Sequence, residues 1–266
     1  IKIDGGAGGS RSHPQHSFRL EPGNSSLGDG DIKYPLIPSR PNRTSYAKFY
    51  IRNGSNQYLF YPCKDAIETK CMGHETKNTY SAYTPVQVYL NGQYWGYYEL
   101  REKLDADYFK QNYGTMEDSL QILSVSYWYG GVLRAVTGED PVTRFNNDYQ
   151  HFLELNAQNE NFYSETDKLF DLKYYTDYIC AQSWIGNTDW PYNNIRILRS
   201  PQTSNKWQFS LIDLEWSLNP NGWQNSGFDH IGFMLYYDSS FPYIHLWQKA
   251  MENKKFHDYF INRFAD

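Results

Sequence analysis

The sequence predicts an α+β protein of two lobes, a small β-rich lobe over about residues 1–100 and a larger, mainly helical lobe over about 104–266. Two hairpins and a helix-rich middle lead to this prediction. Asn91-Gly92 separates two apolar, strand-like runs, and this dipeptide is the strongest short-range signal of a β-hairpin. A second hairpin is predicted over 195–213. The lobes are predicted to join at a hinge over about 99–103.

Composition restricts the class of protein. The 266 residues suit one large domain or two closely packed lobes. A net charge of −5 and the lack of a basic stripe argue against a nucleic-acid partner, since such a protein needs basic residues to displace counterions. The 25 Tyr, 15 Phe and 8 Trp, with abundant Asn, are typical of secreted or surface proteins. We find no apolar run approaching the ~20 residues of a membrane span and no signal peptide, so we expect a fragment whose targeting segment lies upstream.

The glycine-rich segment 5–14 is predicted to connect strands over 1–3 and 17–21. Its glycines could bring backbone N–H groups against a phosphate, and Arg11 and Arg19 could add positive charge. A flexible hairpin loop is the alternative interpretation.

Two residues, Arg19 and Lys48, are alternative candidates for the cation that would neutralise the charge of a bound phosphate. Arg19 lies on the polar face of its alternating strand, and Lys48 lies in a strand predicted over 47–52. A short helix is expected over 65–72. Its Glu68 could pair with such a cation, or it could be a solvated surface residue.

The second strand of the Asn-Gly hairpin runs over 94–100 and leads through a connector into a helix predicted over 104–113. This order of strand, connector and helix is how the hinge of a protein kinase joins its two lobes. If the connector is such a hinge, it carries the adenine pocket. Glu99 and Arg101 are therefore candidate nucleotide-binding residues.

Further elements are predicted from periodicity. A strand is expected over 120–123 and a long loop between 215 and 240. Helices are predicted over 143–156, 172–184 and 243–264.

Three cysteines do not make a disulfide framework. Cys63 and Cys71 could form a bridge in an exported protein. Cys180 lies in an apolar helical run and is interpreted as a buried free thiol.

Residues 187–215 carry the strongest chemical signal. Asp189 is followed five residues later by Asn194, then by a short apolar strand, a turn and a second apolar strand that ends at Asp213 and Glu215. Protein kinases use this order for the catalytic base, a magnesium-binding Asn and a magnesium-binding Asp. The alternative is an Asx-rich turn, although carboxylates beside a buried strand are costly unless they bind something.

The spacing suits phosphoryl transfer. This reaction needs one carboxylate at the attacking hydroxyl and hard oxygen ligands for Mg²⁺ beside the phosphates. Asp189 and Asn194 can bracket a tight loop and face one cavity, while Asp213 leaves the neighbouring strand of the hairpin.

The motif Asn187-Thr188-Asp189-Trp190 with Asn193-Asn194, and the hairpin over 88–103 around Asn91-Gly92, are the most specific stretches of the chain. Together with 10–20, 51–54 and 212–215, they resemble the CotH family of atypical, secreted protein kinases first associated with bacterial spore coats. The resemblance follows the expected order over nearly the whole chain.

The resemblance implies a kinase-like two-lobed fold and phosphorylation of Ser residues in coat or extracellular proteins, using ATP with Mg²⁺ or Mn²⁺. Asp189 would be the base, Asn194 and Asp213 the metal ligands, and Glu215 a ligand of a second metal. Gln15 and His16 stand where the family often has lysines, and Glu215 stands where a second Asp commonly follows.

Two functions remain open from the sequence. The first is an exported protein kinase at the cell surface or in a spore coat. The second is a non-catalytic binding module, a surface adhesin or coat component, because a fold does not fix a function. The family includes both uses, the second through fungal surface invasins.

Overall fold

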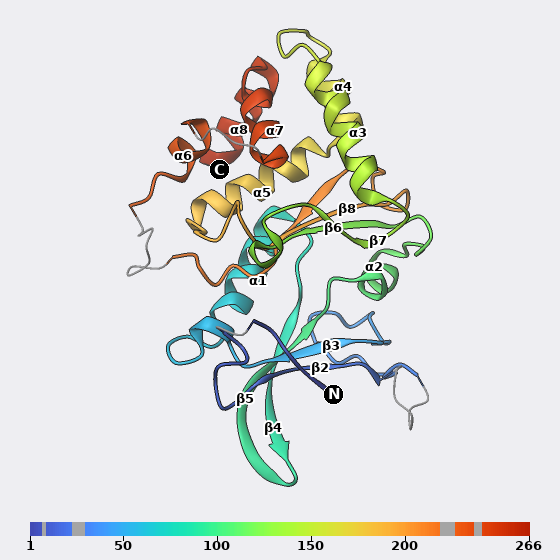
Figure 1. Cartoon of the computed structure of the whole chain (residues 1–266), viewed down its shortest axis with the longest axis vertical. Coiled ribbons are helices and arrows are strands. Elements are labelled where there is room, and N and C mark those ends of the chain that lie inside the picture. The colour runs from blue at the N-terminus through green and yellow to red at the C-terminus, as the bar shows by residue number, and fades with distance from the viewer. Residues whose placement is uncertain (7–8, 23–29, 219–226, 237–240) are drawn as a thin grey trace. The chain divides into compact units, whose positions relative to one another are not determined.

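The computed structural model describes residues 1–6, 9–22, 30–218, 227–236 and 241–266 (Figure 1). Contacts within the chain divide it into two compact units. Unit 1 comprises Ile1–Cys71 and Tyr80–Thr115, and unit 2 comprises Met72–Thr79 and Met116–Asp266. Each unit contains an antiparallel sheet together with helices. The predicted α+β class is confirmed.

The compact units separate after Thr115, so the helix that follows the expected hinge groups with unit 1. The helix over Lys64–Thr76 runs from one unit into the other. A hinge at 99–103, and lobes meeting there, stay predictions.

Unit 1 is built on a five-stranded sheet of order β1-β2-β3-β5-β4. The hairpin is confirmed, with Asn91 and Gly92 both at positive φ, as a tight turn between β4 and β5 requires. Residues 7 and 8 of the glycine-rich segment lie outside the described residues. The elements of this part of the chain are β1 (Lys2–Asp4), β2 (Ser17–Leu20), β3 (Phe49–Arg52), η2 (Ser55–Gln57), α1 (Lys64–Thr76), β4 (Tyr83–Leu90), β5 (Gln93–Glu102) and α2 (Ala106–Tyr113).

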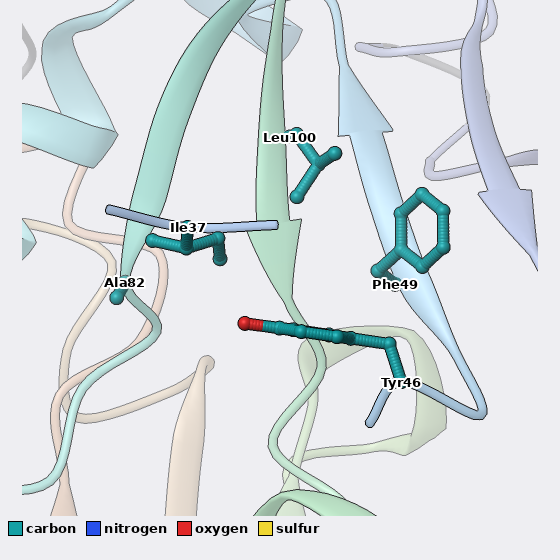
Figure 2. Packing of buried hydrophobic residues seen from close by; sticks show 5 residues of the cluster. All are labelled: Ile37, Tyr46, Phe49, Ala82 and Leu100. Carbon is teal, nitrogen blue, oxygen red and sulfur yellow. The ribbon is translucent and has the colours of Figure 1, made fainter. Parts of the chain in front are cut away.

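The apolar face of this sheet packs against non-strand segments of unit 1. Figure 2 shows Phe49 of β3 and Leu100 of β5 beside Ile37, Tyr46 and Ala82, all buried. Alternation along β3 and β5 directs Phe49 and Leu100 to this apolar face and Arg52, Glu99 and Arg101 to the other, polar face. Glu102, at the end of β5, lies opposite Phe49 at the margin of the apolar face.

A buried ion pair lies at the end of β5. The guanidinium of Arg43 is 1% exposed and contacts Glu102 at 2.9 Å and Asp107 at 2.8 Å. Glu102 also accepts a hydrogen bond from the backbone N–H of Ala82 (2.9 Å). The pair joins the segment before β3 to β5 and α2.

Asn53, which directly follows β3, holds the loop before β2. Its Nδ2 donates to the main-chain oxygens of Gln15 (2.6 Å) and Ser10 (3.3 Å), and its Oδ1 accepts from the hydroxyl of Ser17 (2.8 Å). Asn53 is 1% exposed. One buried amide thus fixes an irregular loop that has little apolar surface of its own.

Unit 2 combines a four-stranded antiparallel sheet of order β7-β6-β8-β9 with helices (Figure 1). Helix α5 packs on β9, and α3 packs on β6 and β7. The elements are β6 (Gln121–Val125), η3 (Tyr127–Tyr129), β7 (Arg134–Thr137), α3 (Pro141–Glu154), α4 (Phe162–Leu169), α5 (Leu172–Trp184), β8 (Ile195–Arg199), β9 (Gln208–Ser210), α6 (His230–Tyr236), α7 (Pro242–Met251) and α8 (Lys254–Ala265).

The predicted helices over 143–156 and 172–184 and the second hairpin are confirmed. The single helix expected over 243–264 is wrong, because Asn253 ends α7 and caps α8 by accepting from the N–H of Phe256 (3.2 Å). The loop expected between 215 and 240 contains α6. Parts of that loop lie outside the described residues.

The buried pair gives a prediction about stability. Arg43→Met should lower the free energy of unfolding by ~3–5 kcal/mol, because it leaves the buried carboxylate of Glu102 without its closest cation. Arg40→Met is the matched control, since Arg40 is more exposed and lies 3.5 Å from the same carboxylate. Chemical denaturation measures both. Equal losses in the two variants would contradict the assignment.

Candidate functional site

The loop after α5 is held by Asn187, which is 1% exposed. Its Nδ2 donates to Oε1 of Gln182 (2.8 Å), and its Oδ1 accepts from the backbone N–H of Asp189 (3.2 Å). Thr188 donates from its hydroxyl to the main-chain oxygen of Trp216 (3.0 Å). This hydrogen bond joins the loop that contains Asp189 to the segment after β9, which contains Asp213 and Glu215.

Asp189 and Asn194 are brought together. Oδ2 of Asp189 accepts from Nδ2 of Asn193 (2.8 Å) and from Nδ2 of Asn194 (2.7 Å). Asn194 has φ +54°, a left-handed conformation that Asn tolerates better than most residues, and β8 begins at the next residue. With its amide nitrogen used on Asp189, Asn194 has its carbonyl Oδ1 on the opposite arm of the same planar group.

Asn193 was not among the residues predicted for the site. It binds the carboxylate of Asp189 alongside Asn194, and its Oδ1 accepts from the backbone N–H of Tyr127 (3.0 Å). The signal in the sequence was the Asn-Asn pair directly before a strand. Either amide could have been the partner, and the chain uses both.

The environment of Asp189 raises its pKa above the ordinary value of an aspartate. Burial is the largest cause, and the negative charge of Asp213 acts in the same direction. The hydrogen bond from Asn193 lowers the pKa and offsets part of the shift. Asp213 thus lies within electrostatic reach of Asp189, as expected of two acids at one site.

The acids after β9 occupy different environments. The strand ends at Ser210, so Asp213 lies three residues beyond it, in a left-handed conformation (φ +50°) and half-buried. Glu215 is 2% exposed. Asp213 is the acid whose charge acts on Asp189. Metal ligation by Asn194, Asp213 or Glu215 stays a prediction.

Within the described ranges, no group of three or more His, Cys, Asp or Glu is arranged to hold a metal ion. Mg²⁺ does not require such a group, because it is commonly bound by one or two carboxylates, substrate phosphates and water. The carboxylate of Asp213 and the amide oxygen of Asn194 are the hard donors that Mg²⁺ and Mn²⁺ prefer. The donor chemistry therefore fits the ion.

Unit 1 contains its own charged cluster, on the polar face of the sheet. Asp65 of α1 contacts the guanidinium of Arg101, which is 3% exposed, and that of Arg52 at 2.9 Å. The neighbouring Glu99 is 1% exposed, and burial raises its pKa to about 7 despite the nearby Arg101 and Arg52. Two of the predicted nucleotide-binding residues, Glu99 and Arg101, thus lie within a buried ionic network.

The helix acid that meets the strand cations is Asp65, whereas the sequence drew attention to Glu68. Glu68 pairs with Lys64 one turn earlier at 3.3 Å. Arg52 lies opposite Glu99 across β3 and β5, so it faces the same side of the sheet as Glu99 and Arg101.

The other predicted phosphate-binding residues are distributed over unit 1. Arg19 pairs with Asp4 (3.5 Å) and Glu21 (3.1 Å), Arg11 is exposed, and Lys48 lies half-buried just before β3. Their roles stay predictions.

Gln15 has a structural role in unit 1. Its Oε1 accepts from the hydroxyl of Tyr58 (2.8 Å), and its Nε2 donates to the main-chain oxygen of Trp95.

The three cysteines are free. A bridge between Cys63 and Cys71 does not form. Eight residues of helical rise separate them by ~12 Å, beyond the reach of a disulfide.

Comparison with known proteins follows the geometry. A family model described as CotH kinase protein matches residues 1–266, the whole chain. The chain belongs to the CotH family. This family is described as one of kinases, which indicates a kinase-like function. A search of curated proteins found no match to the chain. In the described ranges, no helix has the length and apolar character to cross a membrane.

The raised pKa of Asp189 gives a prediction about pH. Because the folded-state pKa lies above the unfolded value, ionised Asp189 destabilises the fold as pH rises above about 3.8. Asp189→Asn keeps an oxygen for both amides and removes the charge. Its melting temperature should exceed that of the wild type at pH 7, and the difference should disappear in acid. The exposed Asp118→Asn is the control and should show no such trend; a pH-independent difference at Asp189 would contradict the prediction.

Proposed function

We propose that this chain is a metal-dependent protein kinase that transfers the γ-phosphate of ATP to Ser residues of extracellular or coat proteins. The observation that carries the proposal is the hydrogen bond of 2.7 Å between Asn194 and the carboxylate of Asp189, with the charge of Asp213 acting on the same carboxylate. This is the grouping that phosphoryl transfer needs: a base, an amide oxygen and a second acid.

Asp189 is the proposed base. Its Oδ2 accepts hydrogen bonds from the amides of Asn193 and Asn194, and these two bonds fix the orientation of the carboxylate. The acceptor Ser gives its hydroxyl proton to Asp189 while the Ser oxygen attacks the γ-phosphorus of ATP. The bond between the γ-phosphorus and the β,γ-bridging oxygen breaks, and ADP is released. A raised pKa makes the carboxylate a better proton acceptor.

Asn194 and Asp213 are the proposed ligands of Mg²⁺ or Mn²⁺, with Glu215 as a further candidate. The bound ion would neutralise charge on the phosphates. The hydrogen bond from Nδ2 of Asn194 to Asp189 orients the amide oxygen of Asn194. Secretion to a cell surface or spore coat, and a protein acceptor, belong to the same proposal.

A second candidate function is a non-catalytic surface adhesin or coat component. It is favoured by the exposed aromatic side chains near the tip of the β4–β5 hairpin, where Tyr89 and Tyr94 are more than half exposed and Trp95 is 36% exposed. Tyrosine and tryptophan on a surface are common in binding sites.

Asp189→Ala separates the two functions. A catalytic base contributes roughly 10²–10⁴-fold, so the variant should lose transfer of radiolabelled phosphate from ATP to a Ser-rich extracellular protein while its affinity for ATP changes only a few-fold. Asp118→Ala serves as the control. If the wild type transfers no phosphate with Mg²⁺ or Mn²⁺, and the substitution changes only the melting temperature, the adhesin or coat function stands instead.

Asp213→Asn tests the metal. Nucleotide raises the free energy of unfolding by RT ln(1 + [L]/Kd), so a tenfold weaker Kd lowers this gain by about 1.4 kcal/mol at high ligand concentration. We expect a reduced gain with ATP and Mg²⁺ and a melting temperature near wild type without ligand. Thermal unfolding in the presence and absence of ATP and Mg²⁺ measures both. An equal gain in both proteins would show that the acid is structural.

A further inference from the structure

The segment 127–136 of unit 2 exposes a run of large apolar side chains. Tyr127 and Trp128 are 68% and 71% exposed. The segment also contains the exposed residues Tyr129, Val132 and Val136. Soluble proteins rarely expose five such side chains within ten residues. An exposed apolar patch of this kind commonly marks a site of protein contact.

The exposure is built into an ordered turn. The backbone N–H groups of Tyr129 and Gly131 both donate to the main-chain oxygen of Ser126, at 3.0 and 3.1 Å. Gly130 and Gly131 have positive φ, which closes the turn. The aromatic rings therefore project from a fixed backbone.

The turn is attached to the proposed base. Asn193 accepts from the N–H of Tyr127 through Oδ1 (3.0 Å) and donates from Nδ2 to Asp189 (2.8 Å). A single side chain thus couples the position of the aromatic turn to that of Asp189. The backbone of Tyr127 is therefore separated from the carboxylate of Asp189 by one side chain.

Strand β7 begins within the same segment and has an available edge. It pairs with β6 on one side, and among the described residues no strand pairs with it on the other. Arg134, Ala135 and Val136 are exposed. An extended peptide can add to such an edge through main-chain hydrogen bonds and place alternate side chains on the neighbouring surface.

We propose that segment 127–136 is the acceptor-binding site of the kinase, and that it takes an extended peptide with an aromatic or large apolar side chain beside the acceptor Ser. The proposal rests on the proposed function. Arg134 stacks on Tyr129, with its guanidinium carbon 4.0 Å from the ring centroid. The positive charge of Arg134 disfavours a basic residue beside the acceptor Ser. The exposed side chains of Tyr127, Trp128 and the two valines favour an apolar residue there.

The test combines binding with catalysis. Fluorescent peptides with one Ser flanked by Trp, Lys or Gly are titrated by anisotropy and assayed as phosphate acceptors with ATP. The double variant Tyr127→Ala, Trp128→Ala should raise the Kd and acceptor KM of the Trp peptide about tenfold or more, with the KM for ATP unchanged. Trp184→Ala, at a residue of similar exposure (66%) on α5, is the control and should change neither.

Peptide N-methylation tests the strand edge. N–H groups alternate between the two edges of a strand, so methylating alternate residues should weaken binding strongly in one set of positions and weakly in the other. Equal effects in both sets would overturn addition to β7.

The outcomes distinguish the two proposals. Phosphate transfer with an acceptor KM that the double variant leaves unchanged, or a preference for the Lys peptide, overturns the acceptor site and leaves the kinase function standing. Binding of the Trp peptide that depends on Tyr127 and Trp128, without transfer, overturns the kinase function and leaves a peptide-binding site. Absence of both binding and transfer overturns both.

Discussion

The cost of burying a polar or charged group without a partner governs how the irregular parts of this chain are held. Asn187 ties the Asp189 loop to α5, and Asn53 ties the loop before β2 to the end of β3. Arg43 and Glu102 join segments far apart in the sequence. These side chains hold backbone that lies outside the helices and strands and therefore needs other hydrogen-bond partners. They act together with buried apolar residues of the same segments, such as Trp190, Ile37 and Tyr46.

The charged network of unit 1 follows the same rule with a different result. Asp65 is contacted by both Arg52 and Arg101, so α1 is anchored to two strands by a single carboxylate. Glu99 has a carboxylate with no such arrangement of close contacts, and burial raises its pKa to about 7. Its nearest cation is Arg101, whose guanidinium lies 4.0 Å from the carboxylate, and this contact offsets only part of the cost of burial.

Much of the fold could be predicted from local signals. Asn91-Gly92 specified its hairpin, and α5 coincides with the helix expected from periodicity, capped by Asp171. The predictions failed where a short element lacks a local signal, as in α6 and β7, or where a capping residue such as Asn253 interrupts an apolar pattern. Spacing placed Asp189 beside Asn194. It could not show that Asp65, and not Glu68, contacts the strand cations, because that depends on how α1 packs against the sheet.

The burial of Asn53 has a practical consequence. Asn53-Gly54-Ser55 is an acceptor sequence for N-linked glycans, which a eukaryotic secretory pathway adds to the side-chain nitrogen. In the folded chain that nitrogen donates to Ser10 and Gln15 and has almost no exposure, so a glycan has no room there. A glycan added before folding would replace one of the Nδ2 hydrogens that Asn53 donates to the loop before β2. The end of β3 could then not pack against that loop. Expression in a bacterial host, or with Ser55→Ala to remove the acceptor sequence, avoids this route to misfolding.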